Sequence, residues 1–256
     1  MNTFVLKLIA IITMTIDHFA IAVGTNITDG QAELSPYMTK PVYMILRGIG
    51  RIAFPIFAYL IVEGFFYTKN LTKYILRLFI FAFISQVPFS LVNSRVILDT
   101  HKQNVFFTLG LGLICVYMLD MLIKLSKQAK EKNEPMPYIN IMLGIGIIII
   151  CIVSVVLNTD YSIMGILLIM IFYIFRADTT LPKMSKPNIL RFTFLGISMM
   201  LLILTLNFGI EIFAPFALIP IAMHNRQKGP SMKYFFYAYY PGHFAVLYLI
   251  ICILPF

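Results

Sequence analysis

Residues 139–157 of this chain read INIMLGIGIIIICIVSVVL, a run without a charged residue. Its length is close to the ~20 apolar residues that an α-helix needs to cross the hydrocarbon core of a bilayer. A transmembrane β-strand is about half as long and alternates apolar with polar residues, which this run does not do. The stretch therefore predicts a membrane-spanning helix.

The composition of the whole chain points the same way. Of its 256 residues, 60% are hydrophobic and 12% are charged, and the mean hydropathy is +0.88. Water-soluble domains do not carry so much apolar surface, so a soluble fold is excluded. The net charge of +9 does not indicate nucleic-acid binding, because the Lys and Arg residues lie mainly in short gaps between apolar runs. We predict an all-α, polytopic integral membrane helix bundle.

Apolar windows recur along the chain and leave no long loop for a separate soluble domain. We therefore expect a single transmembrane domain over residues 1–256, with about nine spans and a range of eight to ten. The expected spans are residues 3–24, 42–67, 73–93, 104–123, 139–157, 161–176, 191–207, 209–223 and 233–254. Between the seventh and eighth, Asn207 and Gly209 either close a tight hairpin or interrupt a re-entrant segment.

The first apolar segment has two interpretations. Lys7, the apolar run and the triplet Ala20-Ile21-Ala22 have the order of a cleaved signal peptide. Asp17 and His18 inside the run favour a retained first helix, because a signal-peptide core has no use for an ionisable pair.

Basic residues are shared unevenly between the gaps. Most of them follow the second, fourth, sixth and eighth spans, whereas the opposite gaps hold only Lys40, Arg95 and Lys102. The positive-inside rule then places the N-terminus and the even-numbered gaps in the cytoplasm. We expect a multi-pass protein of the plasma membrane whose C-terminus lies outside the cytoplasm.

A few ionisable residues lie within the spans. Asp17 and His18 fall in the outer half of the first span, and Arg47 and Arg51 fall in the outer half of the second, one helical turn apart. Each charge at membrane depth costs about 2.5–3.5 kcal/mol, so these groups persist only if they pair. We expect Asp17 to bind Arg47 or Arg51, and Pro55 to kink the second span.

Polar residues of other spans are expected at a similar depth and predict one polar cavity in the outer leaflet. They are Gln86, Asn104, Asp160, Tyr161, Tyr239, Tyr240 and His243. Glu63 lies near the cytoplasmic end of its span, where we expect a structural role: it either extends to the membrane surface or pairs with Lys69 or Arg77. Cys115, Cys151 and Cys252 lie in apolar runs without paired spacing, so neither a disulfide framework nor a metal site is indicated.

The intramembrane residues have both a structural and a functional interpretation. Asp17, Arg47 and Arg51 form either an ion-pair network that fixes helix packing or the electrostatic part of an active site. His18 and His243 are either satisfied interior histidines or proton-transfer groups. Two intramembrane histidines alongside carboxylates favour proton chemistry.

Several segments have an order of residues that no packing rule demands. The most specific is RGIGRIAFPIFA at residues 47–58. The others are Leu6-Lys7 through Asp17-His18, Glu63-Gly64, Ser85–Phe89, Asn104–Leu109, Asp160-Tyr161 and Tyr240–His243. With these segments the chain resembles, through nearly its whole length, the TraX family, membrane proteins named for an enzyme that acetylates the N-terminus of conjugative pilin.

The resemblance implies a membrane-embedded acyltransferase, related to a wider group that takes acyl-CoA and uses an essential intramembrane histidine. It implies acetyl transfer from acetyl-CoA, or transfer from another acyl-CoA, to an amine such as a peptide or protein N-terminus, or to a hydroxyl, at the outer half of the membrane. His18 matches that histidine, and His243 fits equally. The implied partners are the bilayer, the acyl-CoA and a surface-bound acceptor, with no metal and no nucleic acid.

For this chemistry we expect His18 to act as the general base or to carry the acyl group. Asp17 with Arg47 and Arg51 would set its electrostatics, and Asn104, Gln86 or Tyr240 would donate hydrogen bonds to the developing oxyanion. A transporter or flippase that uses the same charges as a relay is the rival class. A non-catalytic assembly factor for a surface peptide is the third.

Overall fold

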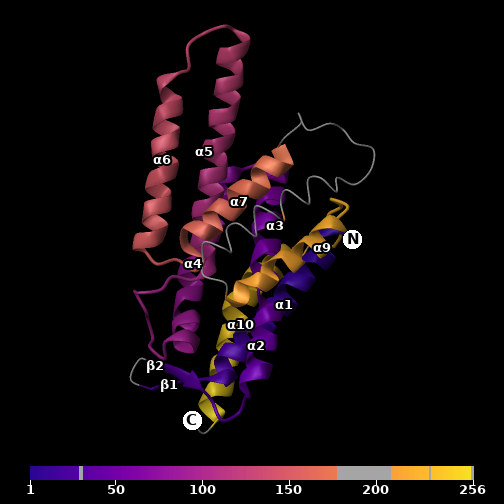
Figure 1. Ribbon diagram of the computed structural model, residues 1–256, viewed down its shortest axis with the longest axis vertical. Coiled ribbons are helices and arrows are strands. Elements are labelled where there is room, and N and C mark those ends of the chain that lie inside the picture. Colours follow the sequence, from indigo (N-terminus) through magenta and orange to yellow (C-terminus); the bar gives the residue numbers. More distant parts are fainter. Residues whose placement is uncertain (29–30, 178–195, 197–208, 231, 255–256) are drawn as a thin grey trace. The chain divides into compact units, whose positions relative to one another are not determined.

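A computed structural model describes residues 1–28, 31–177, 196, 209–230 and 232–254 of the chain. Within this part the chain is almost entirely helical, as the composition predicts (Figure 1). Six of its helical segments are long and apolar enough to cross a membrane: Thr3–Gly24, Lys40–Tyr67, Leu71–Asn93, Val105–Glu131, Tyr138–Val156 and Tyr234–Ile253. The protein is a membrane-embedded, multi-pass helix bundle.

The helices begin and end close to the residues at which the apolar runs begin and end. They are α1 (Thr3–Gly24), α2 (Lys40–Gly50), α3 (Ala53–Tyr67), α4 (Leu71–Asn93), α5 (Val105–Glu131), α6 (Tyr138–Val156), α7 (Ser162–Ala177) and α10 (Lys233–Ile253). Apart from residue 196, the expected span at 191–207 lies outside the described residues, and so does Asn207. The expected span at 209–223 is a 3₁₀ helix, η1 (Ile210–Ala217), followed by α9 (Leu218–Ala222). Together they are apolar but shorter than a bilayer crossing needs.

Two local features differ from the sequence-based expectation. After α1, the strands β1 (Thr25–Thr28) and β2 (Gln31–Leu34) form an antiparallel pair with Thr25 opposite Leu34. In addition, α5 continues to Glu131, beyond the expected end at residue 123. Lysines are good helix formers, and Lys124 forms an ion pair with Asp120 one turn earlier at 2.7 Å, so the helix persists into the polar gap.

The expected kink at Pro55 takes the form of a break between α2 and α3. Pro55 has no N–H to donate to the carbonyl of Arg51, and its ring crowds that carbonyl. The chain ends α2 with a tightened turn, in which the Arg51 amide donates to the carbonyls of both Arg47 and Gly48 at 3.2 Å. Arg47 therefore lies in the last turn of α2 and Arg51 just after it.

The chain packs as two compact units. Unit 1 comprises Met1–Leu60, Phe83–Thr100 and Thr179–Phe256, and unit 2 comprises Ile61–Ala82 and His101–Asp178. In unit 1, α1 contacts both α2 and α10, and α2 contacts η1. In unit 2, α5 contacts α6 and α7 around buried Leu111, Cys115, Cys151 and Ile166 (Figure 1).

Candidate functional site

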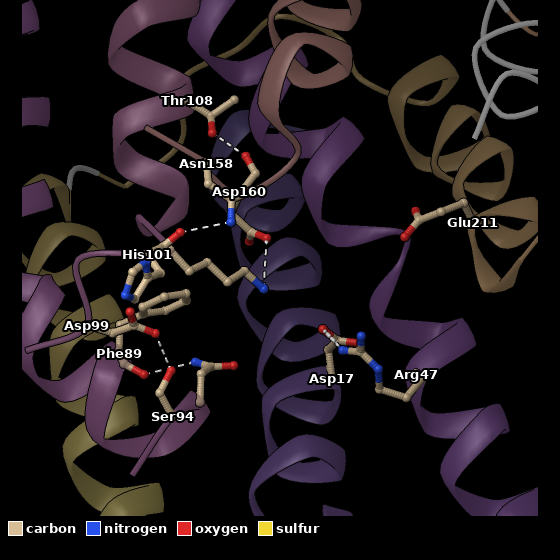
Figure 2. Close-up of polar contacts among 12 residues, drawn as sticks. Asp17, Arg47, Phe89, Ser94, Asp99, His101, Thr108, Asn158, Asp160 and Glu211 are labelled. Carbon is tan, nitrogen blue, oxygen red and sulfur yellow. Dashed lines mark hydrogen bonds and ion pairs between the residues drawn. The ribbon is translucent and has the colours of Figure 1, made fainter. Parts of the chain in front are cut away.

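The carboxylate of Asp17, buried on α1, is the centre of a charged cluster in unit 1. Nη1 of Arg47 and Nη2 of Arg51 both donate to its Oδ2, each at 2.6 Å. Figure 2 shows Asp17 and Arg47 pointing toward each other from separate helices. Nη1 of Arg51 also donates to Oε1 of Glu211 at 2.8 Å. Two arginines thus offset two carboxylates, which lowers the cost of keeping these charges in a membrane protein.

The structure contains the ion pair that the sequence suggested, and it engages both arginines rather than one. Glu211, at the start of η1, is the member of the cluster that was missed. Its signal was a single carboxylate in the apolar run 209–223, which in a membrane protein calls for a cationic partner.

Gly50 makes the close approach of α1 and α2 possible. A Cβ atom at Gly50 would lie 2.2 Å from Cβ and 2.3 Å from Oδ1 of Asp17. Any larger residue would therefore displace the carboxylate. The segment Arg47–Arg51 combines two cations one turn apart with the small residue that admits the anion. Oδ1 of Asp17 has no hydrogen-bond partner within the described residues.

The next residue of α1, His18, faces α10. Its Nδ1 lies 2.7 Å from Nε2 of His243, and the two rings stack with centroids 5.0 Å apart and planes 17° apart. Nδ1 of His243 lies 3.0 Å from the backbone carbonyl oxygen of Tyr239. His243 is buried, whereas His18 is partly exposed. The ring of Tyr240 lies edge-on to the ring of His18, with the two ring centroids 6.3 Å apart.

These contacts assign the protons of the neutral histidine pair. A carbonyl oxygen only accepts, so Nδ1 of His243 carries a proton and Nε2 of His243 is the acceptor nitrogen. Nδ1 of His18 must then donate to it, which leaves the lone pair of His18 on Nε2. The pair has the arrangement of a base that is oriented by a second histidine.

A further contact fixes α10 against α1 beside this pair. The hydroxyls of Thr15 and Tyr239 lie 2.7 Å apart, and the Tyr239 ring stacks on His243 with the planes 10° apart. Thr15 also donates to the carbonyl of Ile11, so Tyr239 is the donor between the two hydroxyls. The ring of His243 is thereby held by Tyr239 as well as by His18.

Gln86, on α4 in unit 1, has a backbone partner. Its Nε2 donates to the carbonyl of Asp99 at 3.0 Å and lies 3.5 Å from Oγ of Ser90. The carboxylate of Asp99 in turn accepts from Ser94 (Figure 2). The Gln86 amide therefore stabilises the segment that follows α4.

The remaining predicted site residues belong to unit 2. Asn104 caps α5 by accepting from the Phe106 amide, and it donates to the carbonyl of Ala82 at 2.7 Å. The carbonyl of Asp160 accepts from Thr108 (Figure 2), and Tyr161 has a left-handed φ of 63° in the turn before α7. The structure joins Asp17 to Arg47 and Arg51, and His18 to His243, in unit 1. A single cavity shared by all these residues stays a prediction.

Comparison with known proteins assigns the family. The TraX protein family matches residues 3–251. One relative, the "probable fimbrial assembly protein FimC, serogroup H1" of Dichelobacter nodosus, is 36% identical over 124 residues, which is 45% of this chain and 45% of that protein. The matched region thus spans less than half of that relative, and no solved structure matches the chain. The family match covers nearly the whole chain, and the protein belongs to the TraX family.

Proposed function

We propose that the protein is a membrane-embedded acyltransferase that moves an acetyl group from acetyl-CoA, or a related acyl group from its CoA thioester, to an amine. The observation that carries the proposal is the hydrogen bond from His18 to His243, because it leaves a lone pair on Nε2 of a partly exposed histidine. Family membership supports an N-terminal amine as the acceptor. The name of the fimbrial relative supports an acceptor of the surface-fibre class.

In the proposed step, Nε2 of His18 takes a proton from the acceptor amine as the amine nitrogen attacks the thioester carbonyl. The carbon–nitrogen bond forms, the carbon–sulfur bond breaks, and the proton passes from His18 to the departing thiolate. While His18 is cationic, its Nδ1–H remains bonded to His243, which stabilises the charge and fixes the ring. We assign to Tyr240, edge-on to His18, the hydrogen bond to the developing oxyanion.

The Asp17 cluster has a positioning role in this proposal. It lies one residue before His18 on α1 and fixes that helix to α2 and η1 through Arg47, Arg51 and Glu211. Neighbouring residues of a helix point in different directions, so Asp17 acts on His18 through the helix rather than by direct contact.

A proton or substrate relay is the second candidate function. The same hydrogen bond between His18 and His243 favours it, because paired intramembrane histidines also carry protons. The two functions differ in one observable, since only the enzyme consumes acyl-CoA.

The test is release of free coenzyme A from acetyl-CoA by purified protein in the presence of a peptide with a free N-terminal amine. Loss of a general base lowers reaction rates by about 10²–10⁴-fold. We therefore expect the His18→Asn variant to release coenzyme A more slowly than wild type by that factor. His101→Asn removes an exposed imidazole of unit 2 and is the matched control, with near wild-type release expected. Thermal unfolding of each variant establishes that it is folded.

The role of His243 requires a conservative pair of substitutions. His243→Gln keeps an oxygen that can accept from His18, whereas His243→Leu removes every acceptor. We expect His243→Gln to retain more activity than His243→Leu. If no acyl-CoA and amine pair gives release above background in the folded wild-type protein, the relay is favoured instead.

A further inference from the structure

The end of α3 in unit 2 holds a second ionic group that the proposed reaction does not use. Glu63 is buried there, and its Oε1 accepts from Nε of Arg176 on α7 at 2.6 Å. The guanidinium of Arg176 lies over the ring of Phe66, and its Cζ atom is 4.7 Å from the ring centroid. Phe66 is itself stacked on Tyr173 with the planes 7° apart. Arg176 is therefore held in one orientation by an ion pair and an aromatic surface.

Arg176 has donors that no described residue uses. Its Nε donates to Glu63, while its two terminal NH₂ groups have no hydrogen-bond partner within the described residues. The side chain is 21% exposed, so part of it is accessible. The second oxygen of Glu63, Oε2, is buried without a partner in the described chain, so that carboxylate does not compete for them from the surface.

A second arginine lies on α4, next to a tyrosine that reaches the same turn of α3. The guanidinium carbon of Arg77 lies 5.8 Å from the ring centroid of Tyr74, whose hydroxyl would lie 2.5 Å from a Cβ at Gly64. Nε of Arg77 is buried without a hydrogen-bond partner among the described residues. The sequence suggested that Arg77 or Lys69 pairs with Glu63, and this was wrong: Arg176 takes that role because α7 brings it to α3.

We infer that this end of unit 2 binds a phosphate group, with Arg77 and Arg176 as the donors. Planar guanidinium groups fit phosphate oxygens in pairs, and stacking on an aromatic ring reduces the freedom that binding must restrict. The formal charge of the surrounding side chains is positive. The segment from Glu63 to Arg77 carries Lys69, Lys73 and Arg77 against one carboxylate, Glu63, and α7 adds Arg176.

The phosphate has two possible sources of the same chemistry. One is an anionic lipid headgroup, since the positive-inside rule places these helix ends at the cytoplasmic surface. The other is a soluble phosphorylated compound such as coenzyme A. The inference is independent of the histidine pair, because it concerns binding and not transfer.

The test measures binding directly on the purified full chain. Coenzyme A is titrated calorimetrically in a neutral detergent. In parallel, thermal unfolding is compared in nanodiscs of phosphatidylcholine with and without phosphatidylglycerol. Arg77→Gln breaks no hydrogen bond found in the described residues, and Arg176→Lys keeps a cation for Glu63 but loses the planar fork, so both should fold. Lys127→Gln, which removes the same charge from the end of α5, is the matched control.

We expect each arginine variant to bind about tenfold more weakly than wild type or Lys127→Gln, which is the worth of one charge-assisted hydrogen bond. If the arginine variants bind coenzyme A more weakly in the titration, the ligand is a soluble phosphorylated compound. Loss only of the stabilisation by phosphatidylglycerol identifies a lipid headgroup. The inference is overturned if wild type neither binds coenzyme A nor is stabilised by phosphatidylglycerol. It is also overturned if Lys127→Gln weakens binding as much as the arginine variants do.

Discussion

At the scale of single residues, Arg47 and Arg51 bind the same oxygen of Asp17 but differ in their burial and in their other contacts. Arg51 is 9% exposed and joins Asp17 to Glu211, whereas Arg47 is 18% exposed and, among the described residues, forms an ion pair with Asp17 only. We expect Arg51→Gln to lower the free energy of unfolding by about 3–5 kcal/mol, because it leaves the buried carboxylate of Asp17 and the half-buried carboxylate of Glu211 without their shared cation. Arg47→Gln should lower the free energy of unfolding by a smaller amount.

Denaturant unfolding of both variants in the same detergent measures the difference. The two arginines lie one turn apart at the same helix end, so each is the control for the other. Equal losses would contradict the assignment of Arg51 as the link between α1 and η1.

The sequence was informative about this cluster for a definite reason. Charges in a membrane must pair, so Asp17 and the two arginines predicted one another from helix position alone. No comparable rule relates His18 to His243, which lie on the first and last helices. Their hydrogen bond depends on the packing of α1 against α10, and it therefore needed the structure.

At the scale of helices, the contact between α1 and α2 depends on Gly50. An added Cβ would meet the Asp17 side chain at 2.2 Å, so we expect Gly50→Ala to lower the free energy of unfolding by about 1–3 kcal/mol or more. Gly144→Ala on α6 is the control, because nothing lies within 4 Å of an added Cβ there. That variant should be neutral or slightly stabilising, since Ala favours helix over Gly. Thermal unfolding of both variants measures the difference. A Gly50→Ala variant as stable as wild type would contradict the packing of α1 against α2.

The helical elements were predictable because most of them are long apolar runs that polar gaps separate. Pro55 likewise indicated the interruption between α2 and α3, since its ring and missing N–H act through local chemistry. The hairpin of β1 and β2 was missed. Its signal was the dipeptide Asp29-Gly30 between two short runs that contain Thr and Ile, a sequence typical of two-residue hairpin links.

At the scale of the whole molecule, α1 and α10 run in the same direction. Phe4 packs beside Phe236, and His18 bonds to His243 further along both helices. The first and the last helix of the described chain therefore begin on the same side of the membrane. The described residues contain six segments that are long and apolar enough to cross it. A total of about nine crossings, with a range of eight to ten, stays our prediction.

The orientation of the chain gives a test at this scale. We expect Glu33→Cys, on β2, to react with a membrane-impermeant maleimide in intact cells, and Glu134→Cys, after α5, to react only after permeabilisation. Cys252 is the exposed native cysteine and is replaced by Ser in both variants, while Cys115 and Cys151 are buried. The reverse pattern would invert the topology and place the phosphate site on the other face.

Acetyl transfer itself is the central claim, and the most direct measurement follows a labelled acetyl group. Purified protein in nanodiscs is incubated with labelled acetyl-CoA and a peptide whose N-terminal amine is free, alongside the same peptide with that amine blocked. The account predicts label in the free peptide with wild type, about 10²–10⁴-fold slower labelling with His18→Asn, and none in the blocked peptide. Equal labelling by folded His18→Asn would contradict His18 as the base, and label that stays on coenzyme A with every amine acceptor would contradict acyl transfer.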